Sequence, residues 1–313
     1  MATTFLRLSV SYLLDPLPPK GAEKKSSDEP EPPRKQNVFH ISEIPRWMQW
    51  DPYILHGYRA QLDSFERCFW SLFYLHNESI NTWSHMLPGL YFLTVLLAID
   101  YWITQLPLEV PVADILAIQT YVAGTAGCLI FSAAFHATNA HSPEVAHAFL
   151  KLDYLGIVLT ISTTCISVAY FGLYGEPAMQ ALYIVFTIFS AVMAFWVALD
   201  RRMDGARAGP WRATVFFFLA ASGLAPICHV AWNEGWSGLT RIPLDSLSVT
   251  CTSYAIGTAA YVTRFPEKFW PERFDLIGAS HQIFHILVAF GQMVHLFGLR
   301  EVLLRVHMNV CTV

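Results

Sequence analysis

Three histidines in this sequence have the types and spacing of metal ligands. His281 and His285 are four residues apart in the segment GASHQIFHILVAF, so on a helix they would share one face. Two imidazoles at this spacing can bind one metal ion together, as in other helical zinc sites. His136, in the segment CLIFSAAFHATNAH, could supply a third imidazole. A three-histidine set leaves one tetrahedral position open for water, which is typical of catalytic rather than structural zinc.

Ser132 and Asp153 are the polar groups that could act beside such an ion. Ser132 lies one helical turn before His136, and Asp153 follows in the segment KLDYLGI. Either side chain could hold or deprotonate a water, and because zinc can lower the pKa of bound water to about 7, Asp153 need not be a strong base. The residues alone leave two alternatives open. Histidines four apart also occur as packed or interfacial pairs, and histidines inside a membrane can relay protons.

The elements that would position these residues are long apolar blocks. Of the 313 residues, 54% are hydrophobic and only 14% are charged, whereas soluble domains carry nearer a quarter charged residues. Blocks of about 20 apolar residues are long enough to cross a bilayer as helices, and isolated strands would leave backbone groups unsatisfied in lipid. The sequence therefore predicts an all-α integral membrane protein with a bundle of seven transmembrane helices, at residues 84–103, 115–137, 152–173, 179–199, 215–232, 247–262 and 277–299.

Lys and Arg predict how these spans are oriented. If the N-terminus is cytoplasmic, 17 of the 20 Lys and Arg residues fall on the cytoplasmic side, and the other side holds only Arg241, Arg300 and Arg305. This is a strong positive-inside bias. The sequence therefore predicts a cytoplasmic N-terminus and a C-terminus outside, which is opposite to the orientation of G-protein-coupled receptors.

The segments outside the spans are short or polar. Residues 1–37 include a stretch rich in Pro, Lys, Glu and Ser and are expected to form a disordered cytoplasmic tail. We expect a cytoplasmic juxtamembrane segment at residues 38–83, a transmembrane domain at 84–300 and a short extracytoplasmic tail at 301–313. The six cysteines form no CxxC pair, which argues against a disulfide framework. No basic run or nucleic-acid motif is present, so the expected partner is the lipid bilayer and not nucleic acid.

The predicted topology brings the polar candidates to one depth. The second span reaches the cytoplasmic side at Ser132 and His136, and the third and seventh spans start from that side with Asp153 and with His281 and His285. Because the topology was derived without these residues, their agreement in depth independently supports a common site. Ionisable groups in a membrane are costly and are therefore candidates for function.

Other polar residues are expected to have structural roles. The segment HNESINTWSH, at residues 76–85, precedes the first span on the same side and could line the entrance to the site or hold that span by hydrogen bonds. His229 is expected to make a helix–helix hydrogen bond, and Pro226 beside it to kink the fifth span. His295 lies about 21 Å along the helix from His281, too far to bind the same ion.

Six motifs occur in an order and spacing that resemble the progestin and adipoQ receptor family, which is related to the haemolysin III proteins. They are LHGYR, HNESINTWSH, FSAAFH, KLDY, RFPEKFWPERFD and SHQIFH, and the resemblance covers about residues 45 to 300. The sequence is more similar to the adiponectin receptor and fungal Izh branch than to the steroid-binding branch. The resemblance implies seven helices, a zinc ion held by His136, His281 and His285, and Ser132 and Asp153 near the zinc-bound water. It also implies slow hydrolysis of a lipid amide such as ceramide.

Three functions are compatible with these observations. The first is a zinc-dependent membrane hydrolase of lipid amides, acting in lipid signalling or in zinc and lipid homeostasis. The second is a receptor with a structural zinc ion and an extracellular ligand that the sequence does not identify. The third is a channel or transporter. Transport would favour polar groups at every depth, whereas here the polar groups are predicted to gather at one end, with almost purely apolar fourth and sixth spans.

Overall fold

The computed structural model describes residues 37–104, 109–203 and 208–308, and the predictions for the tail before Asn37 lie outside this range. The described part is helical, apart from an isolated bridge between Phe39 and Tyr58. Short helices η1 (Ile41–Glu43), η2 (Arg46–Met48) and α1 (Phe65–Ser71) precede the long ones. These are α2 (Ser79–Thr104), α3 (Val112–Thr138), α4 (Pro143–Gly172), α5 (Pro177–Ala198), α6 (Gly209–Ala221), α7 (Leu224–Leu239), α8 (Leu244–Thr263) and α9 (Ser280–Met308), with the short helix η3 (Arg201–Met203) before α6.

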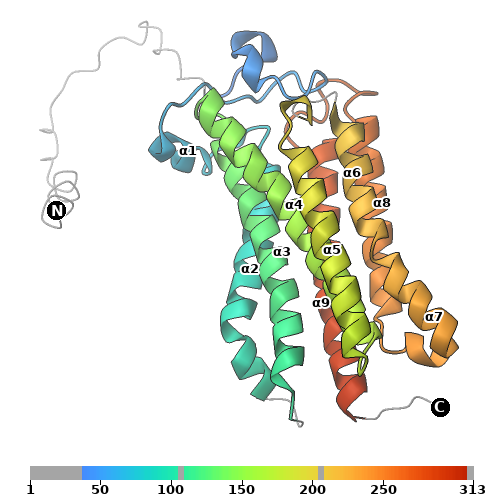
Figure 1. Ribbon diagram of the computed structural model, residues 1–313. Helices are drawn as coiled ribbons and strands as arrows, with labels where there is room; N and C mark the ends of the chain where they lie inside the picture. Colours follow the sequence, from blue (N-terminus) through green and yellow to red (C-terminus); the bar gives the residue numbers. More distant parts are fainter. Residues whose placement is uncertain (1–36, 105–108, 204–207, 309–313) are drawn as a thin grey trace, which may run out of the picture. The chain divides into compact units, whose positions relative to one another are not determined.

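The long helices form seven membrane-spanning segments, which confirms the predicted fold class (Figure 1). Six segments in the described residues are long and apolar enough to cross a bilayer, counting α6 and α7 as one. The seventh is α8, whose many Ser and Thr residues lower its hydropathy. This 20-residue helix packs along α9. The sixth span is therefore less apolar than the sequence interpretation assumed.

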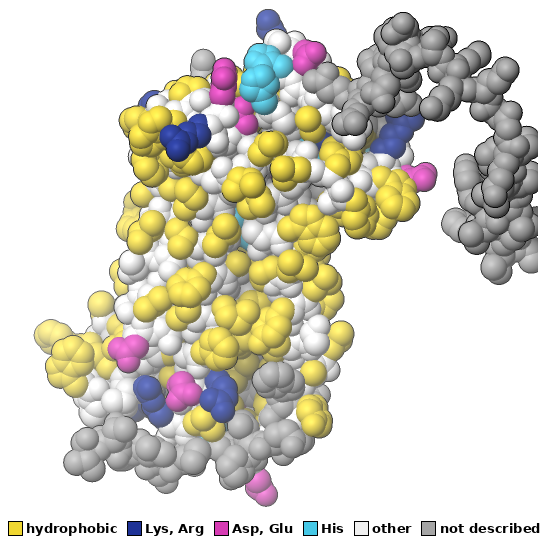
Figure 2. All heavy atoms as spheres, turned by 180° about the vertical axis from the view of Figure 1, so that it is seen from behind, with side chains coloured by type: hydrophobic (Ala, Val, Ile, Leu, Met, Phe, Trp, Pro, Cys, Tyr) yellow, Lys and Arg dark blue, Asp and Glu magenta, His cyan; other side chains and the backbone are white. Residues whose placement is uncertain are grey.

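The surface of the described helices has the pattern of a protein surrounded by lipid. Hydrophobic side chains cover the middle of the face in Figure 2, and charged side chains gather toward its two ends. On α5 the lipid-facing side includes Val185, Phe189 and Trp196, which are at least 63% exposed. Such an apolar surface would aggregate in water but is matched to lipid. The chain is thus an integral, multi-pass membrane protein.

The centre of the bundle is formed by α3 and α4, which pack closely. A Cβ atom on Gly156 of α4 would lie 2.8 Å from the Cα atom of Cys128 on α3, so only glycine allows this approach. Small residues at helix interfaces are a common packing device in membranes. Helix α2 lies against α3 and α9, and α6 and α7 lie against α4. The close contact fixes α3 relative to α4, and with it the relative depths of Ser132 and Asp153.

The fifth span is broken into two helices, as its proline predicts. Pro226 has no N–H to donate to the carbonyl of Ser222, and the N–H of Ala225 contacts that carbonyl instead at 3.4 Å. Helix α6 therefore ends at Ala221 and α7 begins at Leu224. This predicted kink is confirmed.

Several predicted span ends differ from the structure, each by less than three turns. The fifth span, predicted at residues 215–232, extends from Gly209 of α6 to Leu239 of α7. Helix α2 begins at Ser79 rather than at residue 84, and α4 begins at Pro143 rather than at residue 152. In α4, Ser142 accepts a hydrogen bond from the N–H of Val145, and Pro143 occupies the first helical position. Helix α9 continues to Met308, so residues 301–308 of the predicted tail are helical. The differences arise because hydropathy identifies only the part of a helix that lies in the hydrocarbon core of the bilayer. The helices themselves continue beyond that core into polar surroundings.

A second polar cluster lies at the opposite end of the bundle from His136, and the sequence interpretation missed it. Asp114, 1% exposed, accepts hydrogen bonds from the hydroxyls of Tyr170 (2.6 Å) and Tyr174 (3.1 Å), and its carboxylate lies 2.6 Å from Nε2 of His307. These contacts join the ends of α3, α4 and α9. The prediction that polar groups gather at one end only is therefore wrong.

Candidate metal centre

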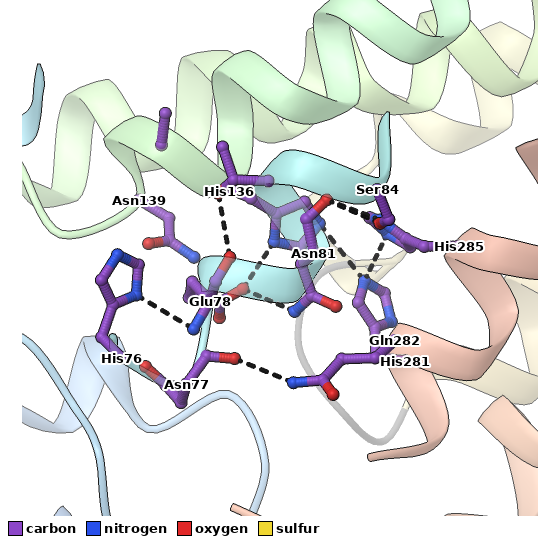
Figure 3. A network of polar contacts seen from close by, with 12 residues as sticks. His76, Asn77, Glu78, Asn81, Ser84, His136, Asn139, His281, Gln282 and His285 are labelled. Carbon is purple, nitrogen blue, oxygen red and sulfur yellow. Dashed lines mark hydrogen bonds and ion pairs between the residues drawn. The ribbon is translucent and has the colours of Figure 1, made fainter. Parts of the chain in front are cut away.

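His136, His281 and His285 meet at one point between α3 and α9. Nε2 of His281 lies 3.3 Å from Nε2 of His136 and 3.1 Å from Nε2 of His285, and no two of the three ligand atoms are more than 4.8 Å apart. His136 is in the last turn of α3, and the other two are in the first turns of α9. Figure 3 shows the three rings converging. The structure thus brings together the three residues that the sequence predicted as ligands.

The spacing of the three nitrogens fits a tetrahedral metal ion. Zinc–nitrogen bonds of about 2.0–2.1 Å in tetrahedral geometry place two ligand nitrogens roughly 3.3 Å apart. The two measured distances from His281 agree with this value. His136 and His285 are each 2% exposed, so their ring nitrogens face one another in a site that is shielded from water. The buried histidine group could therefore hold a metal ion.

The outer nitrogens of two of these rings are bound by Glu78, which immediately precedes α2, and by Asn81 in the first turn of α2. Nδ1 of His136 lies 2.7 Å from Oε2 of Glu78, and Nδ1 of His285 lies 3.1 Å from the carbonyl oxygen of Asn81. Both contacts appear as dashed lines in Figure 3. An acceptor at Nδ1 selects the tautomer that leaves Nε2 free for a metal, and it fixes the ring orientation.

Two further contacts hold this arrangement. Asn81 donates its side-chain N–H to Oε2 of Glu78 at 2.7 Å. The ring of His85 stacks on that of His285, with centroids 3.8 Å apart and an angle of 7° between the planes. Nε2 of His85 also lies 3.1 Å from the backbone carbonyl oxygen of His285. Helix α2 therefore supports two of the three candidate ligands.

Glu78, Asn81 and His85 are site residues that the sequence interpretation did not include. All three belong to the segment at residues 76–85, which the sequence predicts to line the entrance or to hold the first span by hydrogen bonds. Their spacing of i, i+3 and i+7 is that of one helix face, and this signal could have identified them. Because the predicted first span begins at residue 84, it includes His85 but leaves Glu78 and Asn81 ahead of the helix.

Burial and charge act in opposite directions on Glu78. Burial alone would raise the pKa of this carboxyl, but the pKa is held well below its usual value because His136 and Asn81 stabilise the charged form. Glu78 is therefore an ionised carboxylate behind His136. A carboxylate in this place strengthens the ring as an electron donor to a metal.

Ser132 and Asp153 line the same cavity as the three histidines. Ser132 on α3 and Asp153 on α4 both line the wall of this cavity, as do His136, His281 and His285. All five residues predicted for the site thus surround one space.

The cavity has a volume of about 870 Å³, and its lining away from the histidines is mainly apolar. It follows α4 from Asp153 to Val168, which are about 22 Å apart at 1.5 Å per residue. Its far part is lined by side chains such as Ile161, Ile227 and Leu247. A cavity of this length and character fits a long apolar chain with a polar group at the histidine end.

Two other histidines occupy separate positions, as expected. Nδ1 of His229 on α7 lies 2.9 Å from the hydroxyl of Tyr183 on α5, which confirms a helix–helix contact. Nε2 of His295, which is fully buried, lies 3.1 Å from the Ser167 hydroxyl. Neither belongs to the histidine group that could hold an ion.

The sequence is similar to a family of known membrane proteins. The model of the family described as "Haemolysin-III related" matches residues 73–296. The "ADIPOR-like receptor IZH2" of Saccharomyces cerevisiae is 35% identical over 280 residues, covering 88% of this chain and 87% of that protein. The "Adiponectin receptor protein" of Drosophila melanogaster is 34% identical over 278 residues, and the match covers 88% of this chain but 62% of the fly protein. The "Heptahelical transmembrane protein ADIPOR1" of Oryza sativa is 30% identical over 307 residues, covering 81% of each chain.

The matched region contains Glu78, the whole histidine group, the first six spans and the first part of α9, and the resemblance stated on the six motifs is confirmed. The chain belongs to the haemolysin-III-related family of receptor-like membrane proteins, among which are adiponectin receptor and fungal Izh proteins.

Proposed function

We propose that His136, His281 and His285 hold a zinc ion and that the protein hydrolyses a lipid amide such as ceramide. The observation that carries this proposal is the position of Asp153 and Ser132 beside the three histidines, at one end of a long apolar cavity. A structural metal site would need neither the carboxyl group nor the cavity. Three histidines also leave room for a fourth, exchangeable ligand.

Zinc would supply a Lewis acid that polarises the amide carbonyl and makes water more acidic. The carboxylate of Asp153 would accept a proton from the attacking water, whose oxygen adds to the carbonyl carbon. The same carboxyl would then donate that proton to the amide nitrogen as the C–N bond breaks, which gives a fatty acid and an amine. Ser132 would hold Asp153 or the water in place by a hydrogen bond.

The cavity supports a lipid as the substrate. An acyl chain could lie along α4 between Asp153 and Val168, where each buried methylene contributes about 0.8 kcal/mol to binding. The amide at the head of that chain would then lie at the histidine end. We propose that the lipid enters sideways from the bilayer, because its tails are never in water.

The test is hydrolysis of ceramide by the purified protein in nanodiscs, measured as release of sphingoid base. We compare the wild type with Asp153→Asn and with Asp114→Asn, a matched loss of a buried carboxylate at the other end of the bundle. We expect turnover in the wild type and in Asp114→Asn, and a loss of at least 100-fold in Asp153→Asn. Full turnover in Asp153→Asn would rule out Asp153 as the base.

A receptor is the second candidate, and the names of the Drosophila and yeast relatives favour it. In this case the zinc would be structural, and an extracellular ligand would shift the packing of the helices. Both functions hold together if the ligand regulates hydrolysis. Zinc without turnover on any ceramide would favour the receptor alone.

A transporter is disfavoured by the packing of α9. The buried polar side chains of Gln292 and His295 are followed along the helix by Leu299, Val302 and Leu303, which are at most 2% exposed, before His307 is reached. These side chains form an apolar layer between the two polar ends. The polar groups therefore do not form a continuous path along this helix.

We also propose that the histidine site faces the cytoplasm, with the N-terminus inside and the C-terminus outside. The positive-inside bias of Lys and Arg supports this orientation.

A further inference from the structure

Two charged residues are fully buried in the connecting segments next to the histidine site. Arg59, in the motif LHGYR, is 2% exposed, and Glu267, in the motif RFPEKFWPERFD, is 1% exposed. Neither side chain is one of the candidate ligands. Burying an ion is costly unless its hydrogen bonds are replaced, so the partners of these two residues indicate what they do.

Arg59 binds the end of α3. Its Nη2 donates to the carbonyl oxygen of His136 at 2.7 Å, and its Nη1 donates to the carbonyl oxygen of Ala137 at 2.8 Å. The same guanidinium donates to Oδ1 of Asn139 (2.6 Å) and to Oγ of Ser71 on α1 (2.8 Å). Carbonyls in the last turn of a helix have no partner inside the helix, so Arg59 caps the turn that carries His136.

Glu267 binds the start of α9. Its Oε2 accepts the backbone N–H of Ser280 at 2.8 Å, and its Oε1 accepts the Ser280 hydroxyl. The first intrahelical bond of α9 runs from Ile283 to Ala279, so the N–H of Ser280 has no partner inside the helix. Glu267 therefore caps the residue that immediately precedes His281.

The signs of the two charges match the helix ends that they bind. The C-terminus of a helix carries partial negative charge and favours a cation, and the N-terminus favours an anion. Arg59 is at the C-terminus of α3, and Glu267 is at the N-terminus of α9. Each contact fixes the axial position of a helix within one residue of a candidate ligand.

We propose that Arg59 and Glu267 are positioning residues of the metal site, which set the separation of His136 from His281 by capping α3 and α9. This inference rests on the proposed metal binding. Metal sites require ligand distances within about 0.2 Å of the ideal values, so a small slide of either helix would weaken the site. We expect loss of either cap to lower metal affinity about 10- to 100-fold, as for other residues that orient ligands.

The test uses the full chain in detergent, with zinc affinity measured by chelator competition and the visible spectrum recorded with Co²⁺ in place of zinc. The variants are Arg59→Lys, which keeps the charge but cannot reach four acceptors, and Glu267→Gln, which keeps the shape but removes the charge. Both should bind zinc 10- to 100-fold more weakly and show a changed Co²⁺ spectrum. The control is Asp114→Asn, which removes a buried charge at the other end of the bundle and should change neither readout.

The two capping residues would be merely structural if their variants lowered the unfolding temperature as Asp114→Asn does but kept wild-type zinc affinity and Co²⁺ spectrum. That result would overturn the inference while leaving the metal site intact. If Arg59→Lys does not fold, the zinc affinity and Co²⁺ spectrum of Glu267→Gln and of the milder Ser280→Ala test whether the cap on α9 positions His281. Absence of zinc binding in the wild type would instead contradict the proposed function itself.

Discussion

Glu78, the residue immediately before α2, forms a direct pair with His136 of α3. Oε2 of the carboxylate lies 2.7 Å from Nδ1 of the ring, and the Nε2 atom on the other edge of that ring faces His281 at 3.3 Å. The pair links residues 58 positions apart in the sequence. It makes α2, which supplies no candidate ligand, part of the metal centre.

Replacing Glu78 by Gln should weaken metal binding without unfolding the bundle. The amide keeps the size of the carboxyl and one acceptor, but it lacks the negative charge that strengthens the ring as an electron donor to the metal. We expect a 10- to 100-fold loss of zinc affinity, measured by chelator competition. Glu43→Gln, which changes an exposed carboxylate in η1, is the matched control. Unchanged affinity in Glu78→Gln would show that the pair has no role in metal binding.

The features that could be predicted from the sequence are those encoded by local spacing. His281 and His285 share a helix face because they are four apart, and apolar blocks locate the spans. The contacts of Glu78, Arg59 and Glu267 could not be predicted, because each depends on segments brought together from distant parts of the chain. The cluster of Asp114 and His307 was missed for the same reason, since these residues are 193 positions apart.

Narrowing the far part of the cavity should change the preferred chain length. Ile227→Phe places a larger side chain on α7 where the cavity ends. We expect turnover of long-chain ceramides to fall at least 10-fold relative to short-chain ones, with zinc content unchanged. Val185→Phe, on the lipid-facing side of α5, is the matched control and should have no effect. An equal loss for all chain lengths would mean that the acyl chain does not occupy this part of the cavity.

His76 should make the protein less stable in mild acid. Burial, and secondarily the charge of Arg59, lowers the pKa of His76 to about 3, from about 6.5 in the unfolded chain. Below pH 6.5 the unfolded state therefore binds a proton that the folded state does not, so stability falls as the pH falls toward 3. The loss is about 1.4 kcal/mol per pH unit for one such group.

The contribution of His76 can be isolated by comparing thermal unfolding of the wild type and His76→Gln at pH 7.5 and 5.5. The variant lacks this titration, so its unfolding temperature should fall less between the two pH values than that of the wild type. Identical falls in the two proteins would show that His76 titrates equally in both states.

The proposed orientation can be tested with a protease-cleavable tag at each end of the chain. In intact cells, external protease should remove the C-terminal tag and spare the N-terminal one, if the protein is in the plasma membrane. In sealed microsomes, whose cytoplasmic side faces the medium, added protease should instead remove the N-terminal tag and spare the C-terminal one. Asn77-Glu78-Ser79 matches the N-glycosylation acceptor pattern. A missing glycan on Asn77 is weaker evidence for a cytoplasmic N-terminus, because the burial of Ser79 would also hinder glycosylation of a segment that lay outside. Removal of the N-terminal tag by external protease would contradict the proposed orientation.

Whether the three histidines hold zinc can be measured as the zinc content of the purified chain by mass spectrometry. We expect one zinc per chain in the wild type and in Asp153→Asn, and none in His281→Ala or His136→Ala. His229→Ala, a histidine outside the site, should keep its zinc. A wild type without zinc, or equal zinc in the wild type and His281→Ala, would contradict the claim.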